Sequence, residues 1–412
     1  MNYNTITLPN GLRIIHKPST SQVVYCGYEI NAGTRDEQAG EEGMAHFCEH
    51  TTFKGTQRRR AWHILNCLES VGGDLNAFTN KEDTVYYAAI LRDHTARAID
   101  LLTDIVFHSQ YPQTEIDKEV EVICDEIESY NDSPAELIYD DFENIIFKNH
   151  PLGHNILGSA DQLRTYKTED ALKFTKRYYR PENAIFFIYG DIDFNKVVRL
   201  IQKATIDLSG GKPIVDRKDV FTELNTYQPQ QLIVDKGTHQ AHVMIGNRAY
   251  DVFDKRRIAL YLLNNMLGGP GMNARLNLAL RERNGLVYTV ESSMVSYSDT
   301  GLWCIYFGCD PHDVNRCQRL VRKELDRFIQ HPLSDSQLSA AKKQLKGQIA
   351  IACDNRESFA LDFGKSFLHY GWEKDVTNLF KHIDLLTPTD LETVACDIFN
   401  PEKLTTLIYR GQ

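Results

Sequence analysis

Hydrophobic and polar positions recur with two different periods along the first half of the chain. Runs with a period of two, rich in β-branched and aromatic residues, predict strands, and apolar residues three and four positions apart predict helices. The predicted strands are Thr5–Leu8, Leu12–His16, Val23–Ile30, Leu75–Thr79, Thr84–Ile90 and Ala184–Tyr189. The predicted helices are Gly43–Thr52, Ala61–Val71, Asp93–His108, Thr114–Tyr130 and Glu136–Phe147. Strands, then helices, then a closing strand indicate an α+β domain over residues 1–205.

A similar order of elements returns in the second half of the chain. Its predicted strands are Gln231–Asp235, Val243–Gly246, Tyr288–Tyr297, Leu302–Phe307 and Thr405–Tyr409, and its first helices are Asp254–Leu267 and Asn273–Arg283. Residues 206–224 mix glycine, proline and charge and predict a linker, which leaves 225–412 as a second domain. We therefore expect an α+β fold of two similar units, each an antiparallel-rich sheet with helices packed on one face.

Composition and charge narrow the class of protein. The 412 residues include 56 acidic and 46 basic side chains, and this acidic balance disfavours a nucleic-acid partner. The nine cysteines are odd in number and scattered, as expected for reduced thiols in the cytoplasm. We also expect no membrane partner and no export, because the chain contains neither a long apolar stretch nor an export signal pattern at its N-terminus.

The string His46-Phe47-Cys48-Glu49-His50 is the most informative motif for chemistry. His46, Glu49 and His50 stand at positions i, i+3 and i+4 and project from one helix face. Two imidazoles one turn apart can bind one zinc ion, and Glu49 can take a proton from a zinc-bound water whose pKa falls to about 7. Such a string arises by chance in about one comparable chain in thirty, so unrelated histidines remain an alternative.

A catalytic zinc ion usually has three protein ligands, and the acidic helix near residues 119–128 is a source for the third. Glu119 and Glu126 are two turns apart and share one face, and Glu121 and Glu128 form a second such pair. Spacing alone leaves both pairs open, and acidic helix faces are often simply solvated.

His150 and His154 show another metal-like spacing. Pro151 and Gly153 lie between them, so a loop replaces the helix that would place both imidazoles on one face. We therefore interpret these two histidines as structural.

Several strings of the chain carry a resemblance to a known family: GMAHFCEHTTFKGT, GGDLNAFTNKEDTVYYA, the acidic helix and HPLGHNILG. The chain resembles the pitrilysin family of zinc peptidases, the inverzincins, whose members include mitochondrial processing peptidases and insulin-degrading enzymes. The resemblance covers essentially the whole N-terminal half and extends into the second half. It implies a half-length metalloendopeptidase that hydrolyses short or unfolded polypeptides.

The resemblance also implies roles for the acidic residues. One zinc ion per chain would be held by His46, His50 and Glu126, with Glu49 as general base. Glu119 would support catalysis without binding zinc directly.

In the second half, the resemblance points to Arg281 and Tyr288, seven residues apart, as groups that contact the substrate and stabilise the tetrahedral intermediate. Residues Asn76, Ala77 and Phe78 resemble the family's edge strand, which pairs with extended peptide substrate.

Half-length chains of the family pair around a closed chamber, so we expect a homodimer, and a heterodimer is also possible. A non-catalytic scaffold or partner subunit is the main alternative function, although no motif residue is missing. A di-iron carboxylate bundle fits less well, because it needs two Glu-x-x-His motifs on facing helices.

Overall fold

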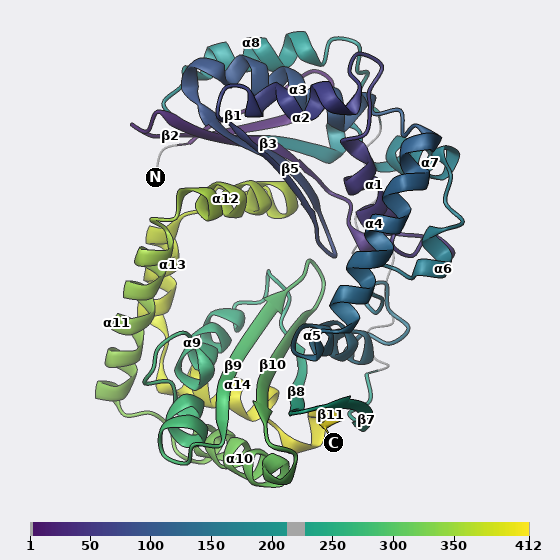
Figure 1. The fold of residues 1–412 in the computed structure, drawn as a ribbon. Coiled ribbons are helices and arrows are strands. Elements are labelled where there is room, and N and C mark those ends of the chain that lie inside the picture. The colour runs from purple at the N-terminus through teal and green to yellow at the C-terminus, as the bar shows by residue number, and fades with distance from the viewer. Residues whose placement is uncertain (1–2, 212–226, 412) are drawn as a thin grey trace. The chain divides into compact units, whose positions relative to one another are not determined.

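The computed structural model describes residues 3–211 and 227–411, which form two compact units (Figure 1). Within the described residues, the first unit comprises 3–128, 154–211 and 352–375, and the second comprises 129–153, 227–351 and 376–411. None of the described helices combines the length and apolar character needed to cross a lipid bilayer.

The first unit is built on a six-stranded sheet. Its strands are β1 (Asn4–Thr7), β2 (Arg13–Pro18), β3 (Val23–Ile30), β4 (Asp74–Thr79), β5 (Thr84–Leu91) and β6 (Ala184–Gly190). They lie in the order β1-β2-β6-β3-β5-β4, and only β2 and β6 pair in parallel. Strand β4 is therefore an edge strand next to β5, which matters for the site described below.

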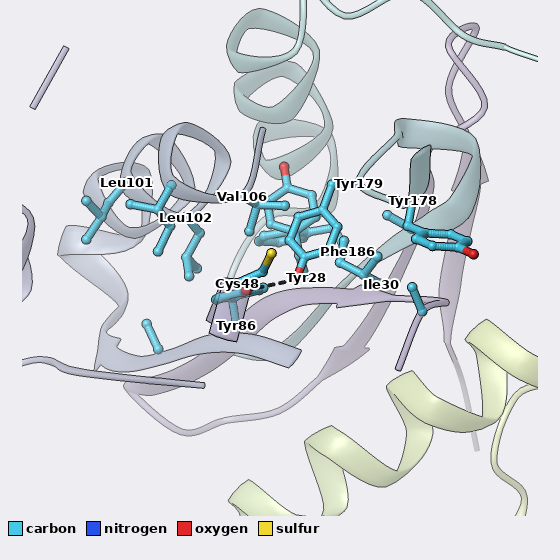
Figure 2. Packing of buried hydrophobic residues seen from close by; sticks show 14 of the residues in the cluster. Tyr28, Ile30, Cys48, Tyr86, Leu101, Leu102, Val106, Tyr178, Tyr179 and Phe186 are labelled. Atoms are coloured by element: carbon cyan, nitrogen blue, oxygen red, sulfur yellow. Dashed lines mark hydrogen bonds between the residues drawn. The ribbon is translucent and has the colours of Figure 1, made fainter. Parts of the chain in front are cut away.

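Helices cover the sheet of the first unit on both faces. The helices of this unit are α1 (Met44–Thr52), α2 (Ala61–Glu69), α3 (Thr95–His108), α4 (Gln113–Asn131), α6 (Ala160–Leu163), α7 (Thr168–Tyr178), α8 (Phe194–Ala204) and α12 (Arg356–Tyr370). Alternate strand residues face α1 and α3, so Tyr28, Ile30 and Phe186 join Cys48 and Val106 in one buried core (Figure 2). The intervening residues of β6 turn the other way and meet α12.

Helix α12 is far from this sheet in sequence but packs directly against β3 and β6. The rings of Phe187 and Tyr189 lie 6.2 and 6.3 Å from that of Phe363 on the helix. Gly364 faces β3 so closely that an added Cβ would lie 2.3 Å from the Glu29 carboxylate. Glycine at this position therefore permits the close approach of helix and sheet.

The second unit repeats the topology of the first. Its strands are β7 (Gln231–Thr238), β8 (Ala241–Ala249), β9 (Val287–Ser296), β10 (Gly301–Cys309) and β11 (Thr405–Gly411). Their order, β7-β11-β8-β10-β9, matches β2-β6-β3-β5-β4, and the parallel pair β7–β11 matches β2–β6. The expected α+β fold of two similar, antiparallel-rich units is confirmed.

Helices also cover both faces of the second sheet. The helices of this unit are α5 (Pro134–Ile146), α9 (Arg257–Gly268), α10 (Val314–Gln330), α11 (Asp335–Ala352), α13 (Val376–Leu385) and α14 (Pro388–Ile398). Trp303 of β10 stacks near Phe399, which follows α14, whereas its neighbours Leu302 and Cys304 pack with Phe142 of α5. Successive residues of β10 therefore face opposite sides of the sheet and contribute to two separate apolar layers.

The units differ from the predicted domains 1–205 and 225–412 because each half of the chain gives one segment to the other unit. Residues 129–153, with α5, belong to the second unit, and residues 352–375, with α12, belong to the first. Each of these helices adds a second helical layer, so helices lie on both faces of each sheet and not on one face as predicted. Periodicity predicted the helix at Glu136–Phe147, but it carries no information on which sheet buries an apolar helix face. Most of the predicted linker 206–224 lies outside the described residues.

Candidate metal centre

Helix α1 presents the three polar residues of the motif from one face. The helix begins after Gly43, whose φ of 87° favours glycine, and its opposite face buries Phe47 and Cys48 in the core. Burial of that face fixes the rotation of the helix about its axis, so His46, Glu49 and His50 all point toward α4 and β4.

His46, His50 and Glu126 converge on one point. Their ligand atoms all lie within 4.8 Å of one another. The Glu126 Oε2 atom is 3.4 Å from His50 Nε2 and 3.9 Å from His46 Nε2. Donor atoms around one tetrahedral zinc ion lie about 3.4 Å apart, because each zinc bond is about 2.1 Å long. The structure thus favours Glu126 over Glu121 and Glu128 as the third donor.

The chemistry of the three donors fits zinc. Two imidazole nitrogens and one carboxylate oxygen form a common catalytic zinc set. Burial, with the nearby charge of His50, lowers the pKa of His46 to about 4, which keeps its imidazole neutral at physiological pH. A hydrogen bond from His50 lowers the pKa of Glu126. The half-exposed Glu126 side chain leaves an approach from solvent for a fourth ligand.

One other group of possible ligands occurs among the described residues, at Asp310, His312 and Asp313. Asp310 and His312 are exposed, and exposed acidic groups are common without a bound ion. The cluster on α1 and α4 differs because a buried helix face orients its two histidines.

Glu119 lies behind His50, on the side away from Glu126. Its Oε1 atom is 3.1 Å from His50 Nδ1, and its Oε2 atom is 2.6 Å from Lys54 Nζ. Burial alone would raise the pKa of Glu119, but the hydrogen bonds from His50 and Lys54 outweigh burial and lower it. An ionised Glu119 accepts the Nδ1 proton of His50 and leaves the Nε2 lone pair for a metal.

Glu49, the predicted general base, lies on the same helix as two of the three donors. It is only 8% exposed, and the Thr79 hydroxyl donates a 2.8 Å hydrogen bond to its Oε2 atom. Burial raises the pKa of Glu49, and the Thr79 hydrogen bond and the charge of His50 oppose this increase. A raised pKa makes the carboxylate a better proton acceptor near neutral pH.

The predicted substrate strand forms one edge of the first sheet. Asn76, Ala77 and Phe78 of β4 pair with Tyr87, Tyr86 and Val85 of β5, and β4 has no partner strand on its other side among the described residues. The same strand packs against α1 and ends in Thr79, the partner of Glu49. An extended peptide added to this edge would run beside Glu49.

Arg281 and Tyr288 lie in the second unit and contact each other. Arg281 is on a π-helical turn, η6 (Asn277–Glu282), and its guanidinium carbon is 5.5 Å from the centre of the Tyr288 ring. Tyr288 is 80% exposed, which is unusual for a tyrosine on a strand. Their action on a substrate at the metal centre stays a prediction.

Sequence reasoning did not identify Lys54 and Thr79 as contributors to this site. Lys54 reaches Glu119 from the turn after α1, and Thr79 reaches Glu49 from the end of β4. Lys54 is four residues after His50 and Thr79 directly follows the predicted substrate strand, so their positions gave a weak signal. Neither contact could be predicted from a motif, because each joins residues from two different parts of the chain.

Comparison with known proteins identifies the family to which the chain belongs. Residues 13–160 match the family model described as insulinase (peptidase family M16), and residues 166–345 match the model described as peptidase M16 inactive domain. The chain belongs to the M16 peptidase family, which confirms the pitrilysin-type resemblance.

Two relatives named as uncharacterized zinc proteases match almost the whole chain. One, from Streptomyces coelicolor, is 33% identical over 400 residues, which cover 95% of this chain and 86% of the relative. Another, from Bacillus subtilis, is 30% identical and covers 98% of this chain and 97% of the relative. These names support a zinc peptidase.

Two crystal structures share the fold over nearly the full length. A protease from Helicobacter pylori superposes with a TM-score of 0.89 at 23% identity and covers 99% of both chains. A peptidase M16 inactive domain from Pseudomonas fluorescens gives a TM-score of 0.91 at 16% identity and covers 100% of this chain and 98% of that one. Because both identities are low, these structures bear on the fold alone.

Proposed function

We propose that this protein is a zinc-dependent endopeptidase that hydrolyses short or unfolded polypeptides. The observation that carries this proposal is the convergence of His46 Nε2, His50 Nε2 and Glu126 Oε2 beside the buried carboxylate of Glu49. One zinc ion per chain would be held by these three residues. When bound, zinc acts as a Lewis acid that lowers the pKa of water and polarises a carbonyl group.

The protein's own groups would move the protons of the reaction. Thr79 holds Oε2 of Glu49, so Oε1 is the oxygen we assign to accept a proton from the attacking water. The protonated Glu49 would then donate to the leaving amine. Glu119 would keep the His50 ring in the tautomer and orientation that expose its Nε2 lone pair.

Substrate binding would use main-chain groups along β4. The free edge at Asn76, Ala77 and Phe78 can pair with an extended peptide whatever its side chains, which suits unfolded polypeptides. Arg281 and the Tyr288 hydroxyl would donate hydrogen bonds to the oxyanion of the tetrahedral intermediate.

We also propose that two chains form a homodimer around a closed chamber and act in the cytoplasm. The nine cysteines are all free thiols, which suits a reducing compartment. The dimer rests on the family resemblance, and the chamber would restrict access to small or unfolded substrates.

The proposed activity can be tested with purified protein and a mixed set of internally quenched peptides. We expect cleavage that stops when a chelator removes the metal and returns when zinc is added. Zinc-loaded protein that cleaves none of the peptides would contradict the proposal for the isolated chain.

A non-catalytic partner subunit is the second candidate function, because residues 166–345 match a model described as an inactive domain. The zinc motif lies outside that match, in residues 13–160, and keeps every residue that the chemistry needs. This candidate predicts cleavage only after a second, different subunit is added.

A further inference from the structure

Glu37 is a buried carboxylate that caps the helix carrying His46 and His50. Its side chain is 1% exposed, and its two oxygens accept hydrogen bonds from the backbone N–H groups of Gly43 (3.0 Å) and Ala45 (2.8 Å). The first N–H groups of a helix have no partner within it, and Gly43 at the N-cap has no side chain to offer. Glu37 therefore supplies from another segment the acceptors that the start of α1 lacks.

His154 holds Glu37 from its other side. The His154 Nε2 atom is 3.0 Å from Glu37 Oε2, so the carboxylate lies between an imidazole and the first turn of α1. The engagement of this ring also explains why His154, despite its metal-like spacing from His150, is no member of the metal cluster. The loop that carries His154 thus contacts the metal-binding helix through Glu37.

The backbone of the same loop contacts the start of α1 at a second place. A Cβ added to Gly43 would lie 2.8 Å from the Cα of Gly158, and one added to Gly158 would lie 2.6 Å from the carbonyl oxygen of Glu42. Both glycines have positive φ, 87° and 71°. Loop and helix are therefore in direct main-chain contact, independently of the His154–Glu37 hydrogen bond.

Lys81 extends this network to the substrate strand. It lies in the turn directly after β4, is buried, and donates through Nζ to the carbonyl oxygen of His154. A continuous series of contacts thus runs from the end of β4 through the loop and Glu37 to the first turn of α1.

We propose that Glu37 and His154 are positioning residues, which hold the first turn of α1 where His46 and His50 can bind a metal together with Glu126. The inference rests on the proposed function of that site. His46 is the residue after Ala45, so any displacement of the capped N–H groups moves its ring directly. Metal affinity depends on ligand positions to within a few tenths of an ångström, and loss of supporting hydrogen bonds lowers it.

The test compares Glu37→Gln and His154→Gln with the matched control Glu41→Gln. The first variant keeps the size of Glu37 but replaces one acceptor oxygen with a donor. Glu41 belongs to the same segment, but its carboxylate is ion-paired with Arg177 and accepts a hydrogen bond from the Gln38 N–H group instead of from the first turn of α1. Zinc dissociation constants are measured by competition with a chromophoric chelator, and visible spectra are recorded after cobalt substitution. Thermal unfolding of the metal-free proteins measures stability separately.

We expect Glu37→Gln and His154→Gln each to weaken zinc binding about tenfold and to change the intensity of the cobalt spectrum. Glu41→Gln should bind zinc as the wild type does, even where its Tm falls by a similar amount. If Glu37→Gln does not fold, His154→Gln carries the test, because its ring lies at the edge of the network and is about one quarter exposed.

Two results would overturn the inference: unchanged zinc affinity and cobalt spectra in both variants, or an equal loss of affinity in Glu41→Gln. Zinc binding is measured without hydrolysis. A wild-type protein that binds zinc but cleaves no peptide would therefore defeat the proposed function and leave the positioning role intact.

Discussion

Glu119 and Glu121 lie two residues apart on α4 and face different partners. Glu119 contacts His50 and Lys54, whereas the exposed Glu121 pairs with Arg164 on the surface. Glu119→Gln should weaken zinc binding about tenfold, because the His50 ring loses its charged acceptor. Glu121→Gln is the matched control and should leave zinc affinity unchanged. Equal effects of the two variants, measured by chelator competition, would contradict a specific role for Glu119.

His50 gives zinc binding a defined pH dependence. Burial lowers the pKa of His50, but hydrogen bonds to Glu119 and Glu126 outweigh burial and raise it to about 9. Below that pH a proton competes with zinc for the imidazole. The apparent affinity should therefore rise about tenfold per pH unit between pH 7 and 9 and then level off. An affinity that is constant over this range would show that His50 gives up no proton when zinc binds.

For single residues, the sequence predicted those that lie within motifs. It predicted few of the contacts that join different elements. His46, Glu49 and His50 could be predicted because one helix fixes their spacing, and the family resemblance selected Glu126 over Glu128. Glu37, Lys54 and Thr79 could not, because each reaches the site from a different segment. Their contacts depend on tertiary packing, which no local periodicity records.

Among the elements, α12 shows how buried polar contacts attach a distant helix to the first sheet. Asp83, directly before β5, lies 3.0 Å from His369 Nε2 and 3.1 Å from Lys365 Nζ. Burial alone would raise the pKa of Asp83, but the charges and hydrogen bonds of Lys365 and His369 hold it well below its ordinary value. A depressed folded-state pKa means that Asp83 stabilises the fold above about pH 4 and loses this effect as the pH falls.

Asp83→Asn should therefore lower the free energy of unfolding by about 2 kcal/mol at pH 7. The difference from the wild type should shrink as the pH falls from about 4 toward 3, because the unfolded wild-type chain then binds a proton at Asp83 while the folded carboxylate stays ionised. Asp93→Asn is the control, because Asp93 is exposed and its nearest cation is 3.8 Å away. Denaturant titrations across this pH range measure the effect, and a constant difference between wild type and Asp83→Asn would contradict it.

The identity of most elements followed from sequence periodicity, but their assignment to units did not. Strand β4 lies at the edge of its sheet, as predicted. Helices α1 and α4 agree with the predicted ranges. The predicted helix Asn273–Arg283 is instead a π-helical turn over Asn277–Glu282. Helices α5 and α12 exchange between the halves because the sheet that accepts an apolar helix face is chosen by packing.

For the whole molecule, the proposed homodimer makes a prediction about mixed chains. The family resemblance implies that Arg281 and Tyr288 of one subunit complete the zinc site of the other. A mixture of Glu49→Gln and Tyr288→Phe chains, each nearly inactive alone, should then recover about a quarter of the wild-type hydrolysis rate. Half of randomly formed dimers are mixed, and each mixed dimer has one intact site. No recovery, with dimers verified by sedimentation, would show that each site is completed within one chain.

The most direct test of the central claim combines zinc content and peptide hydrolysis in Glu49→Gln. The variant keeps His46, His50 and Glu126 and should bind one zinc ion per chain. Its hydrolysis rate should fall about a thousandfold, because an amide cannot accept the proton of the attacking water. Full turnover by the zinc-loaded variant would contradict the role of Glu49 as general base and, with it, the proposed mechanism.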